Sequence, residues 1–188
     1  MRAFIGLAVL FVAFGAQAQE RQISFDFVGF SGDGTQVVLK KYDHNVGWSY
    51  DVYQLADGVS AKRYAFDDSN EKAILKKLTK THAVQPGDGP KSPDGKLFAM
   101  GCQDGKYLDV LIMEKPRIGR FEAIEMPIHK TTKKPAEGML KQAIWSPDGT
   151  WLVVVFTVKT EEYERDEFRA FKFRKWKVKW FREEEAKP

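Results

Sequence analysis

Few residues of this sequence have the types and the spacing that catalysis requires. The segment Gly29–Asp33 nearly matches the nucleophile elbow of hydrolases, in which a serine stands between two glycines, but Asp33 occupies the position of the second glycine. That elbow also joins a strand to a helix, whereas the residues after Gly34 predict a second strand. We therefore assign no catalytic residue, and an enzyme would have to assemble its site from residues without a local signature.

Metal ligands are not indicated by the spacing either. The histidines are His44, His82 and His129. None of them has a paired ligand at the second or fourth residue after it, so we expect surface or loop histidines. Asp67, Ser69 and Glu71 alternate as the ligands of a calcium loop do, but Lys72 stands where that loop requires glycine. We interpret residues 68–71 as the start of a helix and predict no metal site and no cofactor.

A segment near the C-terminus combines cations with aromatic side chains. Apolar and basic residues alternate from Phe168 to Arg182, and the phase of the alternation changes at Arg174–Lys175, so we expect a bulge or a turn there. The candidate ligand-binding residues are Arg174, Lys175, Trp176, Lys177, Lys179 and Trp180. They would contact lipid phosphates, an anionic glycan or an acidic partner. Alternatively, the lysines only protect an edge strand, and the acidic residues at 161–167 and 183–185 neutralise them within the chain.

The elements that position these residues are predicted by a turn sequence that occurs three times. The copies lie at 30–38, 92–99 and 145–155. In each copy serine, aspartate and glycine have the spacing of a tight turn, and an apolar strand follows. The turn aspartates are Asp33, Asp94 and Asp148, which we expect to bond the local backbone. The repeat predicts a mainly β fold of three antiparallel meanders, of about four strands each, with one short helix inserted between Asp68 and His82.

Residues 1–18 are expected to be a signal peptide. Arg2 precedes an apolar run, and Ala16-Gln17-Ala18 predicts cleavage between Ala18 and Gln19. A membrane anchor is the alternative, but about a dozen apolar residues are fewer than the roughly 20 that a span requires. We predict a periplasmic or secreted protein without a transmembrane span after cleavage. Residues 19–188 would form a single β domain with repeats at about 22–66, 91–126 and 141–182.

Composition narrows the possible partners and the redox chemistry. The formal net charge of +4 is too small to indicate nucleic-acid binding. Cys102 is the sole cysteine of the chain, which excludes an internal disulfide, and we expect it to be buried. Trp145 and Trp151 bracket the third turn and are expected to be buried as well.

The sequence Trp145-Ser146-Pro147-Asp148-Gly149, with its echoes at Ser92 and Phe30, resembles the blade motif of TolB-like propellers. The order of the motifs is also similar to a family of predicted secreted bacterial proteins of unknown function. The resemblance implies blade-like meanders in an incomplete ring, because closed propellers need at least four blades. We expect an exported, non-catalytic binding or scaffolding module of the bacterial envelope. The alternative is an accessory or gating β module of an envelope hydrolase, which carboxylates and a histidine gathered where the turns converge would favour.

Overall fold

The computed structural model describes residues 21–181, so the predicted signal peptide lies outside the described residues. The first meander is β1 (Arg21–Phe30), β2 (Gln36–Asp43), β3 (Gly47–Gln54) and β4 (Ser60–Ala65), followed by the helix α1 (Glu71–His82). The second is β5 (Phe98–Asp104), β6 (Tyr107–Glu114) and β7 (Arg117–Glu125). The third is β8 (Glu137–Trp145), β9 (Trp151–Lys159) and β10 (Glu164–Lys172). A 3-10 turn, η1 (Lys175–Lys177), and the short β11 (Lys179–Trp180) complete the described chain.

These strands form two open sheets, which confirms a mainly β fold of antiparallel meanders with one α-helix. One sheet has seven strands in the order β4-β3-β2-β1-β10-β9-β8, and the other has the order β11-β7-β6-β5. The expectation of about four strands per meander holds only for the first. The second and third have three each, because the chain after Lys172 leaves the third meander and β11 pairs with β7 instead.

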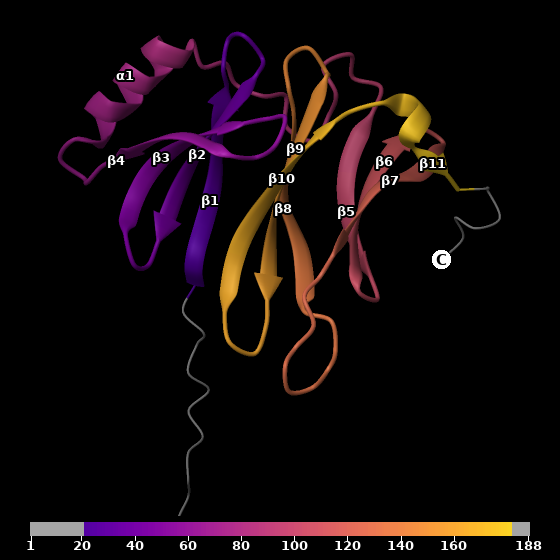
Figure 1. The fold of residues 1–188 in the computed structure, drawn as a ribbon. Helices are drawn as coiled ribbons and strands as arrows, with labels where there is room; N and C mark the ends of the chain where they lie inside the picture. The colour runs from indigo at the N-terminus through magenta and orange to yellow at the C-terminus, as the bar shows by residue number, and fades with distance from the viewer. Residues whose placement is uncertain (1–20, 182–188) are drawn as a thin grey trace, which may run out of the picture.

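The third meander lies between the other two, so the order in space differs from the order in the sequence (Figure 1). One apolar core joins α1 to the first meander, a second joins the first meander to the third, and the last joins the third meander to the second. In β9, Val154 belongs to the core shared with the second meander and Val155 to the core shared with the first. Both are fully buried, which explains the continuous apolar run from Leu152.

The first and third meanders belong to one sheet, but only two residue pairs join their neighbouring strands, β1 and β10. The pairing of β1 with β10 is parallel and covers only Arg21 with Glu164 and Ile23 with Arg165. Beyond that point the two halves of the sheet pack face to face, with Phe25 and Phe168 in edge contact at 5.6 Å between ring centroids.

The three turns have the same hydrogen bonds, including the first copy, in which Gly32 replaces proline. The serine hydroxyls donate to the turn aspartates at 2.5, 2.6 and 2.5 Å in chain order. Each hydroxyl also accepts the backbone N–H of the fifth residue after it at 2.9 Å. The turn glycines have φ of +68°, +73° and +68°, a region that favours glycine. The predicted turns, and the strands predicted to follow them, are therefore confirmed.

The turn aspartates should make stability depend on pH. The hydrogen bond from the turn serine lowers the pKa of Asp33 and of Asp94. At Asp148 burial raises the pKa, but hydrogen bonds from Ser146 and Thr150 outweigh it, so this pKa is also lowered. The unfolded chain then binds more protons than the folded one at acid pH. The stabilisation is present above the unfolded pKa of about 4 and is lost as the pH falls through the lowered values.

We expect a variant with asparagine at all three turn aspartates to lose part of this acid sensitivity. Urea denaturation at neutral pH and at several values below about pH 4 measures the slope of unfolding free energy against pH. The slope of the variant should be shallower than that of the parent. Equal slopes would contradict a contribution from the turn carboxylates.

The helix starts later than predicted and lacks the expected cap. α1 begins at Glu71, and its N-cap residue Asn70 makes no side-chain capping bond. Asp67 instead accepts the N–H groups of Ser69 and Asn70 at 2.9 and 3.1 Å. Glu71 bonds Lys40 of β2 at 2.6 Å and the hydroxyl of Tyr50 at 2.9 Å, so it attaches the helix to the sheet rather than capping it.

One burial prediction was wrong, and another holds only in part. Cys102 is exposed because alternate residues of a strand point to opposite faces. Gly101 approaches Leu140 on the core side of β5, and Cys102 therefore lies on the outer side. Trp151 is only half-buried against the core between the first and third meanders, whereas Trp145 is fully buried as predicted.

Candidate functional site

The C-terminal segment crosses from the third meander to the outer strand of the second. The phase change predicted at Arg174–Lys175 corresponds to η1, which confirms a turn there. After η1 the buried Val178 anchors the chain, and β11 pairs with β7 through Lys179 opposite Arg120 and Trp180 opposite Gly119. A Cβ atom on Gly119 would lie 2.7 Å from Val178 and 2.8 Å from the Lys179 carbonyl, so glycine permits this close approach.

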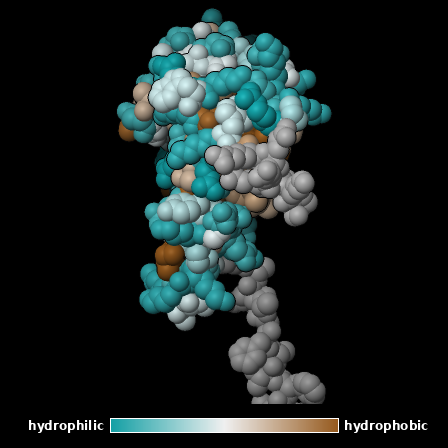
Figure 2. Space-filling view, turned by 90° about the vertical axis from the view of Figure 1, so that its right-hand side faces the viewer, coloured by the Kyte–Doolittle hydropathy of each residue, from teal (hydrophilic) through white to brown (hydrophobic). Residues whose placement is uncertain are grey.

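Half of the predicted ligand-binding residues meet at one groove. Trp176, Lys177 and Lys179 line a surface hollow of about 590 Å³. The opposite wall comes from β7, namely Arg120, Phe121, Glu122 and Ala123. We call this hollow the η1–β11 groove. Figure 2 views the molecule from the side that lies to the right in Figure 1, and shows a mainly hydrophilic surface with scattered apolar residues.

The other predicted residues lie apart from the groove. Lys175 binds Glu114 with its ammonium 2.5 Å from the carboxylate. Trp180 is covered by the guanidinium of Arg117, 4.6 Å from the ring centroid, and packs against the core. Arg174 is exposed but does not line the groove. The predicted set therefore does not act as a single patch.

Charges around the groove are partly compensated. The Lys177 ammonium lies 4.0 Å from Glu122, whereas Lys179 forms no ion pair with a carboxylate among residues 21–181. Arg120 Nε lies 2.7 Å from Oδ2 of Asp109, a buried residue whose pKa is raised by desolvation although Arg120 opposes the shift. The Lys179 ammonium is thus the cation of the groove that remains available to a ligand.

In the described chain, the acidic residues at 161–167 do not neutralise the lysines of the C-terminal segment. Lys175 and Lys177 pair with Glu114 and Glu122 of the second meander, not with residues 161–167. Glu161 instead accepts the backbone N–H groups of Thr131 and Thr132. The second acidic run, 183–185, lies outside the described residues.

Trp176 is the most exposed aromatic side chain of the groove. Its exposed fraction is 80%, whereas Phe121 at the foot of the wall is 5% exposed. An indole that extends into solvent in the same groove as Lys177 and Lys179 can insert among lipid headgroups or stack on a ring, while the ammonium groups contact anions. The arrangement can therefore bind an anion next to an apolar or aromatic group.

Of the three Ser-x-Asp-Gly turns, only the second and third lie together. The second and third form a hollow of about 370 Å³ that includes Asp94, Asp148, Trp145 and Lys175. Both aspartates are hydrogen-bonded within their own turns. The first turn contacts the end of α1 instead, where the Gly32 N–H donates to the His82 carbonyl at 2.9 Å.

The histidines do not come together with these carboxylates. The His82 ring is hydrogen-bonded to the Tyr64 hydroxyl and to Gln36, both at 3.1 Å. His129 lies 3.6 Å from Glu161 in the loop before β8. Within residues 21–181, no group of three or more histidine, cysteine, aspartate or glutamate side chains is placed to hold a metal ion. The same residues include no helix with the length and apolar character needed to cross a bilayer.

Sequence reasoning missed Arg120 and Glu122, which form the far wall of the groove. The sequence predicts a strand only at 121–125 and carries no signal for the pairing of that strand with β11. Comparison of the chain with protein-family models, with curated proteins and with solved structures found no match.

Proposed function

We propose that this protein is an exported, non-catalytic binding module of the bacterial envelope, and that its η1–β11 groove binds the anionic headgroups of a phospholipid surface. The observation that supports this most is the exposed indole of Trp176 beside the lysines of the groove. The shared hydrogen bonds of the three turns support the proposed kinship with TolB-like repeats, since the motif carries the same local structure in each copy.

Physical chemistry favours a lipid surface as the ligand. Tryptophan is enriched at membrane interfaces, where its apolar body and its polar N–H are both accommodated. A lysine near an anionic surface contributes about 1 kcal/mol of attraction, which falls off within a Debye length. Lys177 is the last residue of η1 and Lys179 is the first residue of β11. Both line the same groove as Trp176, so all three side chains can contact one surface.

We expect the chain from Gln19 onward to sediment with vesicles of phosphatidylglycerol and not with vesicles of phosphatidylcholine. A variant with Lys177→Ser and Lys179→Ser should bind about 30-fold more weakly, at about 1 kcal/mol per lysine. Retention should also fall with salt, because the Debye length decreases from about 10 Å at 0.1 M to about 3 Å at 1 M.

The matched control is a variant with Lys76→Ser and Lys77→Ser, which removes two exposed lysines from α1 at the other end of the molecule. It has the same net charge as the groove variant and should bind like the parent. Equal weakening by both variants would show a diffuse charge effect and contradict the groove. Absence of retention by the parent at low salt would leave the lysines as edge protection of β11.

A further inference from the structure

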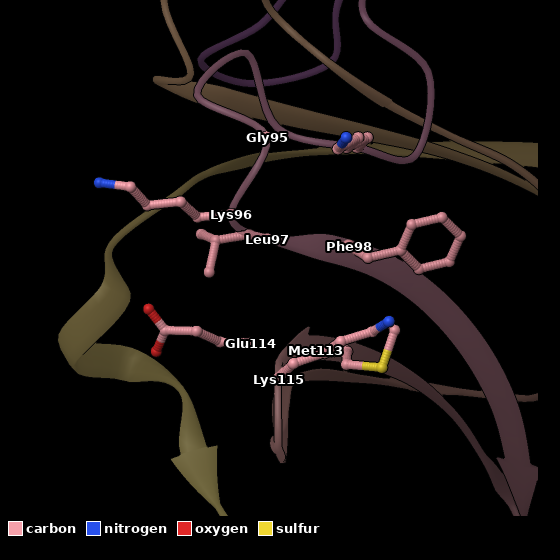
Figure 3. Close-up of a pocket in the computed structure, with 8 residues that line it drawn as sticks. Gly95, Lys96, Leu97, Phe98, Met113, Glu114 and Lys115 are labelled. Carbon is pink, nitrogen blue, oxygen red and sulfur yellow. The ribbon is translucent and has the colours of Figure 1, made fainter.

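A second hollow, of about 570 Å³, lies beside the second turn, where β5 begins and β6 ends. We call it the β5–β6 hollow. Leu97, Phe98 and Met113 border it, and Phe98 and Met113 are directly paired across the two strands (Figure 3). Phe98 is 37% exposed, so the hollow presents apolar surface to solvent. Its volume is within the range of small-molecule sites, about 300 to 1,000 Å³.

Lysines surround this apolar surface. Lys91, Lys96 and Lys115 all line the hollow. Among residues 21–181, no carboxylate forms an ion pair with Lys91 or Lys115. Lys96 differs: its ammonium points away from Phe98 and Met113 in Figure 3 and lies 3.9 Å from Asp94.

The acidic residue of the hollow does not cancel this charge. Glu114 binds Lys175 and Arg117, which lower the pKa of its carboxyl, and its carboxylate points toward η1. The positive field therefore comes from the two unpaired lysines. The Lys91 side chain lies over the second turn, since a Cβ atom placed on Gly95 would be 3.3 Å from its Cε.

We propose that the β5–β6 hollow binds a small amphipathic anion, a molecule with one carboxylate, sulfonate or phosphate group on an aromatic or branched apolar body. The apolar body packs on Leu97, Phe98 and Met113, and the anionic group lies between Lys91 and Lys115. A site that combines an apolar surface with few charged groups selects ligands by both features. This site is separate from the η1–β11 groove and stands without the function proposed for that groove.

Two fluorescent probes test the proposal on the chain from Gln19 onward: anilinonaphthalene sulfonate, and phenylnaphthylamine, which has the same rings without the anion. The parent should bind the sulfonate probe with a stoichiometry of one and more tightly than the neutral probe. Lys91→Ser and Lys115→Ser should each weaken the sulfonate probe at least about tenfold, the lower end of the range for loss of one hydrogen bond to a charged group, and leave the neutral probe unchanged. Phe98→Ser should weaken both probes.

Lys96→Ser is the matched control, since it removes a lysine of the same turn that points away from the hollow. Its affinity for the sulfonate probe should stay within about twofold of the parent, a small free-energy change. Equal weakening by Lys96→Ser would show that surface charge acts diffusely and overturn the site. Unchanged binding in Phe98→Ser would place the probe elsewhere and also overturn it. The groove variant, Lys177→Ser with Lys179→Ser, should bind both probes like the parent, and circular dichroism confirms that each variant is folded.

Discussion

Asp166→Ala is expected to lower the free energy of unfolding by about 3 kcal/mol, the effect of removing one partner from a buried ion pair. Asp166 is fully buried, and its Oδ2 accepts the Phe25 N–H and the Lys141 ammonium, both at 3.0 Å. Its Oδ1 accepts the Thr157 hydroxyl at 2.8 Å. This carboxylate links β10 to β1, β8 and β9 at the place where β1 and β10 share only two paired positions. The variant leaves a buried N–H and a partly buried ammonium without this acceptor.

Urea denaturation followed by circular dichroism measures this loss. The control is Asp26→Ala, which removes a second carboxylate from the same Lys141 ammonium at 3.1 Å. Asp26 is about half exposed, so its pairing should contribute less than about 1 kcal/mol. Similar midpoints for the two variants would show that Asp166 does not hold the first and third meanders together.

Trp145→Ala is expected to destabilise the fold by about 3 to 5 kcal/mol, as for other buried large aromatic side chains. Trp145 is 1% exposed, and its ring contacts Phe173 edge-on at 4.7 Å between centroids. Its indole N–H donates to the Pro90 carbonyl at 3.0 Å. Truncation would therefore leave a cavity next to the second meander and remove one of the two hydrogen bonds that the Pro90 carbonyl accepts, the other coming from the Ala99 N–H.

Trp151→Ala is the comparison. Trp151 stands at the other end of the same turn but is only half-buried, so its truncation should cost clearly less. The sequence alone suggested a strong effect at Trp151, and the structure assigns that effect to Trp145. Thermal denaturation of both variants decides between these expectations, and a larger loss for Trp151→Ala would contradict the burial seen here.

Local features of the fold were predictable because they depend on neighbouring residues. The bonds within the Ser146–Gly149 turn involve groups at most five residues apart, so the sequence specifies them directly. The order of the meanders is not a local property. It depends on the apolar run of β9, which is buried on both faces, and periodicity within that run does not say which strands cover each face.

In the candidate site, too, only the local part could be predicted. The change of phase at Arg174 could be predicted from the sequence around it. The wall of the groove comes from Arg120 and Glu122, which lie more than 50 positions earlier in the chain. The exposure of Cys102 was missed for a related reason. A strand of the second meander has one covered and one uncovered face, and the sequence of β5 does not reveal which side the third meander covers.

The position of the third meander between the other two affects how the protein is made. A nascent chain that ends before Glu137 has only the first two meanders, and each lacks the layer that covers one of its apolar faces. Docking of β8–β10 completes both cores at once, so the fold closes only when the last quarter of the chain has been synthesised. Contacts that span so much sequence form slowly, so the apolar faces of the first and second meanders stay uncovered until this docking step.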